Sequence, residues 1–347
     1  MTTTQLLLLS SFLLLPHSLS AATLTALSSF GGGDGWLAPG ESGYIADTSS
    51  LARGLTYNAV SNKLYVVDRT GGINVRIYNG DTGAAEGTFN VTGITGGTFA
   101  LNMIDVDASG VIYGANLSTA NTSNFKVYQW TNATLAPTLA FDGLTSRVRT
   151  GDTFAVKGSG INTQFIAAGG STANENYALF STSNGATFTS ANPVLTGAVA
   201  GGFRLGIEFG PGGSVLGKQT GSTALFSAAS NGTVTSTALT SNGEAPMAFY
   251  SNGSETFFAA VDVNSNTVNL YDQTLGAPSM SSLNLTTSFS ANGNGVGDLK
   301  FGLGPDGGLR LYVLNTNNGI QAFSVVPEPC TTLLGLAALG LAIRRRR

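Results

Sequence analysis

Histidine and cysteine are almost absent from the sequence. Each occurs once among 347 residues, as His17 and Cys330, and both lie close to an end of the chain. The long segment between them therefore has no disulfide bond. It also lacks the residues needed for Ser-His-Asp or Cys-His catalysis and for zinc or copper sites of the usual kind. Any catalysis by this body would have to rely on carboxylates.

Charged residues are scarce as well, at 10% of the chain, and the formal net charge is −3. Leaving out the residues from Pro327 onward removes four of 16 basic and one of 19 acidic residues, so the net charge becomes −6. We therefore expect no nucleic-acid partner, because phosphate binding needs clustered lysine and arginine. Apolar residues make up 42% and are spread in short blocks, which is typical of a folded chain.

The N-terminus has the pattern of a secretion signal. A ten-residue apolar run, Leu6–Leu15, is followed by Pro16 and then by small residues up to Ala22. Ten residues are too few for a helix to span the ~30 Å hydrocarbon core of a membrane. The first five residues contain no Lys or Arg, which departs from the usual signal pattern. We expect residues 1–22 to be a signal peptide.

The C-terminus consists of three parts in a fixed order, which are a Pro-Glu-Pro motif, an apolar segment and a basic end. They are Pro327, Glu328 and Pro329, then Cys330–Ile343, then Arg344, Arg345, Arg346 and Arg347. The prolines prevent a continuous helix, the apolar segment enters the membrane, and the arginines stay on the cytoplasmic side. This arrangement resembles a PEP-CTERM sorting signal, and we assign it residues 326–347.

The resemblance implies a Gram-negative bacterium and an exosortase that cuts near the motif. The cut would release the protein to the cell surface or into an exopolysaccharide matrix. An apolar segment of 14 residues is short for a full span and suits a transient anchor. The resemblance covers about 21 residues and carries no information about the body, residues 23–325.

The body contains short strands separated by hairpin turns. The clearest copy has strands at Arg53–Tyr57, Lys63–Asp68 and Asn74–Tyr78, with Gly, Asn and Asp in the turns. Comparable first strands begin near Leu101, Asp152, Phe203, Pro246 and Asp298, which gives gaps of 48, 51, 51, 43 and 52 residues. A four-stranded unit at this period predicts a β-propeller of six blades. A β-sandwich or β-solenoid is the alternative.

The last predicted blade is one strand short. We expect the segment Thr23–Phe30 to complete it by pairing with residues around Gln321–Val325, because ring closure hides an otherwise exposed edge.

Six charged residues fall on or near predicted first strands, which face the axis of a propeller. They are Arg53, Asp105, Arg204, Glu208, Asp298 and Lys300. Paired carboxylates can support glycoside hydrolysis. We favour the simpler interpretation that these residues line a water-filled channel and form ion pairs, with no catalytic residues.

We expect no cofactor, although Ca²⁺ remains open because it takes oxygen ligands. The candidates are Asp105, Asp107, Asp262 and Asn264, none of which has the spacing of a known calcium loop.

The favoured function is therefore a non-enzymatic surface or matrix protein that binds polysaccharide or another surface component. The alternative is a carbohydrate-active or lactone-cleaving propeller enzyme that uses carboxylates.

The sorting hypothesis makes a prediction about the mature chain. Mass spectrometry of the surface-released protein should find it without Cys330 and without the four terminal arginines. Changing Glu328 should trap the protein in the membrane, because the cleavage motif is lost. A released chain that still ends in Arg347 would show that the tail is only a short membrane anchor.

Overall fold

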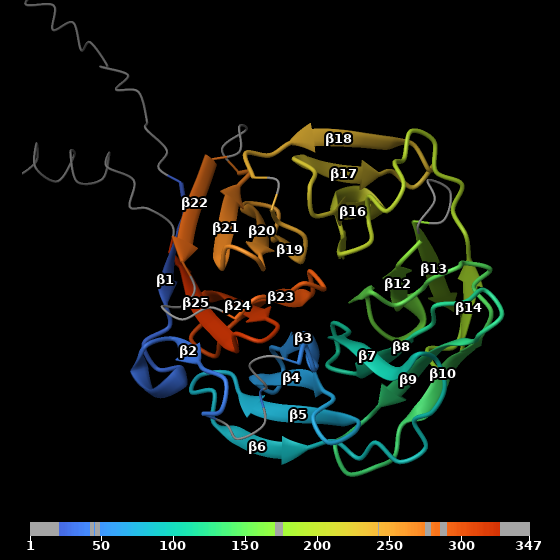
Figure 1. Cartoon of the computed structure of the whole chain (residues 1–347), viewed down its shortest axis with the longest axis horizontal. Helices are drawn as coiled ribbons and strands as arrows, with labels where there is room; N and C mark the ends of the chain where they lie inside the picture. Colours follow the sequence, from blue (N-terminus) through green and yellow to red (C-terminus); the bar gives the residue numbers. More distant parts are fainter. Residues whose placement is uncertain are drawn as a thin grey trace, which may run out of the picture.

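The body is a closed ring of six β-sheets around a central axis (Figure 1). The computed structural model describes residues 21–41, 45, 49–170, 176–241, 243–274, 279–284 and 290–326. Five of the sheets consist of four strands that are consecutive in the chain. The protein is thus an all-β, six-bladed β-propeller, which confirms the predicted fold and excludes the sandwich and the solenoid.

In blades 1 to 5 the chain runs from the axis outward. Blade 1 is β3 (Ala52–Asn58), β4 (Lys63–Asp68), β5 (Asn74–Asn79) and β6 (Ala85–Thr88), and blade 2 is β7 (Phe99–Val106), β8 (Ile112–Leu117), β9 (Phe125–Trp130) and β10 (Thr138–Gly143). Blade 3 is β11 (Thr153–Lys157), β12 (Gln164–Ala168), β13 (Tyr177–Thr182) and β14 (Phe188–Ala191). Blade 4 is β15 (Gly206–Phe209), β16 (Val215–Lys218), β17 (Ala224–Ala228) and β18 (Val234–Ala238), and blade 5 is β19 (Met247–Ser251), β20 (Thr256–Asp262), β21 (Thr267–Asp272) and β22 (Ser279–Asn284). Blade 6 contains β23 (Gly297–Leu303), β24 (Leu309–Asn315) and β25 (Ile320–Val326), joined by β1 (Thr23–Ala26) and β2 (Trp36–Leu37).

The strand boundaries follow the sequence pattern closely. All six innermost strands begin within three residues of their predicted starts. The largest error is in blade 4, where β15 begins at Gly206, so that Arg204 lies in the preceding turn and not on a strand. The described segments contain only 3₁₀ turns as helical structure, at Gly31–Gly33, Gly160–Asn162 and Pro211–Gly213. The described part of the body is therefore nearly free of helix, in keeping with the predicted β-propeller.

Six apolar clusters hold the blades together, one between each pair of neighbours. Between blades 2 and 3, for example, the ring of Tyr113 packs on Phe165 with 5.2 Å between centroids, and Phe165 packs on Phe188 at 3.9 Å. Full burial of one such side chain contributes roughly 1.5–3 kcal/mol. Each blade therefore depends on both of its neighbours for stability.

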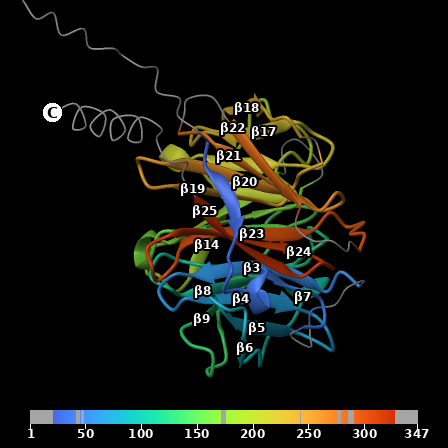
Figure 2. The same cartoon turned by 90° about the vertical axis from the view of Figure 1, so that its left-hand side faces the viewer.

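The N-terminal strand closes the ring, as predicted. Strand β1 pairs antiparallel with β25, from Thr23 opposite Val326 to Ala26 opposite Phe323 (Figure 2). Strand β2 continues along the same edge, with Trp36 opposite Gln321. The amide of Ala22 donates to Asp272 Oδ2 of blade 5 at 3.2 Å, so Ala22 already contacts the body.

The closing strand is shorter than predicted. It ends at Ala26 because the chain turns there, with the amide of Phe30 donating to the carbonyl of Leu27 at 2.9 Å. The turn places the ring of Phe30 in the cluster between blades 6 and 1, where it is fully buried. Its ring centroid lies 6.2 Å from that of Tyr312.

The predicted signal peptide up to residue 20 and the predicted sorting motif from Pro327 lie outside the described residues. Among the segments that are described, no helix has the length and apolar character needed to cross a membrane.

Closure by β1 can be tested with two neighbouring substitutions. Leu24 is buried in the cluster between blades 5 and 6, whereas Thr25 is exposed on the same strand. We expect Leu24→Ala to lower the free energy of unfolding by about 2 kcal/mol, because it leaves a cavity, and Thr25→Ala to change it by less than about 0.5 kcal/mol. Urea unfolding followed by intrinsic fluorescence measures both, and equal effects would contradict the closure.

Candidate ligand-binding site

The six charged residues predicted to line the axis form two separate groups. Asp105 on β7, Glu208 on β15, and Asp298 and Lys300 on β23 meet in the middle of the ring, and we call them the axial cluster. Arg53 on β3 and Arg204 before β15 lie instead in a cavity at one end of the axis.

The axial cluster is an ion-pair network around one lysine. Lys300 Nζ lies 2.7 Å from Asp105 Oδ2 and 3.4 Å from Glu208 Oε2. Asp105 also accepts hydrogen bonds from the hydroxyl of Thr56 at 2.7 Å and from the amide of Val156 at 2.7 Å. Its carboxylate therefore joins the innermost strands of blades 1, 2, 3 and 6.

The remaining carboxylates of the axial cluster are held by backbone amides. Asp298 Oδ2 accepts from the amide of Leu55 at 2.9 Å, and Glu208 Oε1 accepts from the amide of Phe209 at 2.9 Å. Burial raises the pKa of Asp298. Burial also raises the pKa of Glu208, although the positive charge of Lys300 acts to lower it. Burial also acts to lower the pKa of Lys300, but Asp105 and Glu208 together raise it, so that the ammonium stays charged.

The axial cluster closes the channel at this level. The space beside it measures only about 10 Å³, which is too small for a ligand. The expected water-filled channel is therefore not continuous past these four residues, because their side chains converge and pair across the axis.

A larger cavity of about 680 Å³ opens at the end of the axis where the innermost strands begin. Its volume is in the range of small-molecule sites. Four arginines and one aspartate are its charged lining residues, for a formal charge of +3, and we call it the arginine cavity. These residues are Arg53, Arg69, Arg149, Asp152 and Arg204. The body outside this cavity is acidic, so the cavity is a local concentration of positive charge.

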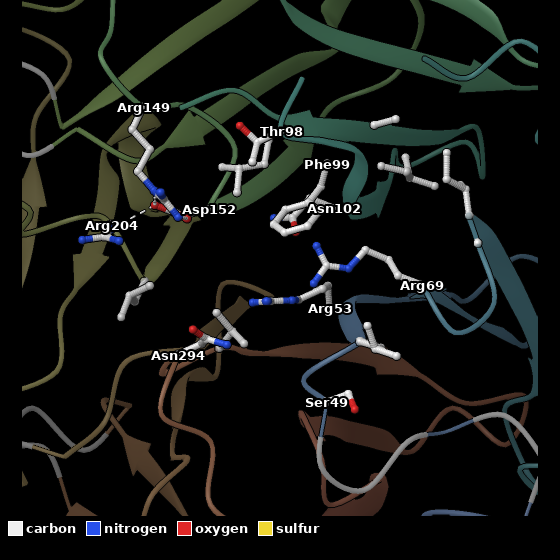
Figure 3. A pocket seen from close by; sticks show the side chains of 18 residues that line it. Ser49, Arg53, Arg69, Thr98, Phe99, Asn102, Arg149, Asp152, Arg204 and Asn294 are labelled. Carbon is white, nitrogen blue, oxygen red and sulfur yellow. Dashed lines mark hydrogen bonds and ion pairs between the residues drawn. The ribbon is translucent and has the colours of Figure 1, made fainter. Parts of the chain in front are cut away.

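Two of the arginines share one carboxylate on one side of the cavity (Figure 3). Arg149 binds Asp152 with two bonds of 2.5 Å, from Nε to Oδ2 and from a terminal nitrogen to Oδ1. Arg204 Nε lies 2.9 Å from Asp152 Oδ2. The hydrogen bond to Asp152 raises the pKa of Arg149. One carboxylate thus fixes two guanidinium groups that belong to different blades.

Arg53 and Arg69 lie on the other side of the cavity and have no carboxylate partner among the described residues. Arg69 donates to the carbonyl of Ser50 at 3.2 Å and stacks on Phe99, with Cζ 3.7 Å from the ring centroid. Arg53 Nε and two nitrogens of Arg69 are buried without a hydrogen-bond partner. Burial lowers the pKa of both residues, and for Arg69 burial and then Arg53 lower it to about 10.

Two β-bulges shape this side of the cavity. The register of β3 against β4 shifts between Ala52 and Leu55, and that of β7 against β8 shifts between Phe99 and Met103. Bulges re-aim side chains and are common beside functional sites. Arg53 lies within the first bulge. The adjacent Gly54 lets β3 of blade 1 lie close to β7 of blade 2, since a Cβ at this position would be 2.7 Å from Ile104 N.

The sequence did not indicate Arg69, Arg149 or Asp152 as site residues. Arg69 follows β4 in a hairpin turn, and Arg149 and Asp152 precede β11 in a loop. The available signal was their position at the ends of strands next to the axis, together with the Arg-x-x-Asp spacing of Arg149 and Asp152.

The four candidate calcium ligands are not brought together. Asp105 belongs to the axial cluster, and Asp107 accepts the amides of Ser109 and Val111 in the β7–β8 turn. Asp262 accepts the amide of Asn264 in the β20–β21 turn. Within the described residues, no three His, Cys, Asp or Glu side chains are grouped so that they could hold a metal ion.

The fold and the site define a six-bladed β-propeller with a closed axis and a cationic cavity at one end. Residues 40–201, which include blades 1 to 3, match a family model described as a domain of unknown function, DUF4623. This match covers slightly less than half of the chain, and the segment is similar to that family. No curated protein matches the sequence.

Solved structures agree with the fold. A DUF4623 family protein from Bacteroides eggerthii superposes with a TM-score of 0.65 at 17% identity, covering 80% of this chain and 71% of that one. A protein of unknown function from Bacteroides thetaiotaomicron gives 0.56 at 15% identity, covering 88% and 76%. A gluconolactonase from Xanthomonas campestris gives 0.50 at 11% identity, covering 89% and 96%. At these identities the likeness concerns the fold alone.

The role of Lys300 as internal counter-ion can be tested by Lys300→Met. We expect a loss of about 3 kcal/mol of unfolding free energy at pH 7, because buried carboxylates lose their partner. Glu208 and Asp298 have folded-state pKa values above the unfolded ones, so their stabilising contribution is present at low pH and lost as pH rises. Without the Lys300 ammonium the pKa values of Glu208 and Asp298 rise further, because the charged carboxylates lose a partner. The loss of unfolding free energy caused by Lys300→Met should therefore be smaller at pH 4 than at pH 7.

The matched control for this test is Lys63→Met, which removes a half-exposed pair with Glu86. It should cost less than about 1 kcal/mol at either pH. A pH-independent effect of Lys300→Met, measured by urea unfolding at pH 4 and pH 7, would argue against the counter-ion role.

Proposed function

We propose that this protein is an exported, non-enzymatic binding propeller that holds an anionic ligand in the arginine cavity. The observation that carries the proposal is the pair of guanidinium groups, Arg53 and Arg69, which line the cavity and have no carboxylate partner in the described part of the chain. The natural ligand class is an acidic polysaccharide or another anionic surface component.

The physical argument is the cost of the unpaired charges. A buried donor without a partner costs about 1–3 kcal/mol, and more when it is charged. Arg149 and Arg204 avoid this cost through Asp152, and Lys300 avoids it through the axial cluster. Arg53 and Arg69 would recover it by binding an anion, since a planar guanidinium matches a carboxylate or sulfate with two parallel hydrogen bonds.

Binding without turnover is favoured over the enzyme alternative by the state of the carboxylates. The three carboxylates next to the axis, Asp105, Glu208 and Asp298, are bonded to Lys300 or to backbone amides and lie where no substrate fits. Asp152, the carboxylate of the arginine cavity, is occupied by two arginines. None of these groups is free to act as a general acid or base.

Export and sorting complete the proposal. They rest on the signal-like segment before Ala22 and on the Pro327-Glu328-Pro329 tail with its exosortase as processing partner. The pairing of Thr23 with Val326 supports this route, because both ends of the body leave the ring at one point of its edge. A transient anchor in the inner membrane would then hold the body by that edge before release to the cell surface.

The proposal is tested by binding of two polyanions, polygalacturonate and dextran sulfate, against neutral dextran. We expect both polyanions to bind and the affinity to fall as NaCl is raised, because salt screens exposed charges. Arg53→Gln should weaken binding at least tenfold.

The control for charge is Lys63→Gln, which removes one positive charge at the start of β4, outside the arginine cavity, and should leave binding unchanged. Equal binding by the two variants would refute the arginine cavity as the site. Hydrolysis of a lactone or glycoside that is abolished by Glu208→Gln, with binding retained, would favour the enzyme alternative instead.

A further inference from the structure

The arginine cavity contains one polar atom that an anion cannot satisfy. Asn102 lies in the bulge of β7 and is 3% exposed. Its Nδ2 donates to the carbonyl of Gly151 at 2.7 Å, which fixes the orientation of the amide. The other end, Asn102 Oδ1, is buried and accepts no hydrogen bond. A buried acceptor of this kind normally has a hydrogen-bond donor as its partner.

The unsatisfied donors of the cavity lie on the same side as this acceptor. Figure 3 shows Phe99, Asn102, Arg69 and Arg53 near one another, and Asn102 Nδ2 reaches Gly151, the residue before Asp152. Strands β3 and β7, which carry Arg53 and Asn102, are the innermost strands of neighbouring blades. The complementary ligand therefore presents acceptors to the two guanidinium groups and a donor to the amide oxygen.

From these groups we infer that the cavity binds a hydroxy acid, with its carboxylate at Arg53 and Arg69 and a neighbouring hydroxyl donating to Asn102 Oδ1. This inference rests on the proposed function and narrows its ligand to acidic sugar residues of the uronic acid type. A sulfate group has no hydrogen to donate and leaves the amide oxygen unsatisfied. A neutral sugar has the hydroxyl but leaves the guanidinium groups unpaired.

The remaining lining fits the body of such a ligand. Beside the charged groups, the cavity is lined by apolar side chains that include Phe99, Leu101 and Leu205. The C–H face of a sugar ring packs on apolar and aromatic surface, while its charged and hydroxyl groups take the polar partners. Phe99 is 38% exposed, although Arg69 stacks on its ring.

The test compares small ligands that differ in one group, measured by calorimetry on the full-length protein. The probes are galacturonate, tetrahydropyran-2-carboxylate, which has the ring and the carboxylate but no hydroxyl, galactose, and inorganic sulfate. We expect galacturonate to bind at least tenfold more tightly than each of the other three. In Asn102→Ala the advantage over tetrahydropyran-2-carboxylate should fall to within about threefold.

The outcomes separate this inference from the proposed function. If galacturonate, the hydroxyl-free acid and sulfate bind equally, the hydroxy-acid preference is wrong and the anion site stands. If none of the three anions binds, the arginine cavity is not an anion site and the proposed function fails as well. Should Asn102→Ala not fold, the comparison of ligands on the unchanged protein decides, because it needs no variant.

Discussion

The pairing of β1 with β25 is the interaction on which the rest of the molecule depends. Each inter-blade cluster buries the faces of two sheets, so a blade with a missing neighbour exposes apolar surface. The ring removes every such face, but only if the last blade is completed. Strand β1 supplies its outer strand, and Phe30 and Leu24 fill the clusters on the two sides of that blade.

Closure also dictates where charge can be placed. Six innermost strands converge at the axis, and polar side chains there are drawn together away from water. In the middle of the ring Lys300 pairs with Asp105 and Glu208, and the axis is sealed. Where the strands begin they diverge, and the bulges in β3 and β7 turn side chains into the opening. There the positive charge exceeds the negative, and the imbalance is what makes the cavity a candidate site.

The sequence predicted the architecture because its signals are local. Strand content, turn residues and the repeat period define six blades, and the missing strand after Phe323 indicates the closing segment. Asp298 and Lys300 are two apart on one strand, so their common direction toward the axis was also predictable. The other contacts of the site join residues that are far apart in the sequence. Asp152 meets Arg204 across 52 residues, and the bulge at Arg53 depends on pairing that no local pattern encodes.

Because β1 and its partner β25 lie at opposite ends of the body, β1 cannot pair until β25 has been synthesised. Thr23 leaves the ribosome about 300 residues before its partner Val326, which at 5–20 residues per second corresponds to roughly 15–60 s. Throughout that interval β1 has an unmatched backbone edge, the kind of template that recruits foreign strands. Its four residues limit the hazard, since so short an edge offers few hydrogen bonds. The shortness of β1 thus limits its pairing with foreign strands during the time in which the chain is incomplete and the ring cannot close.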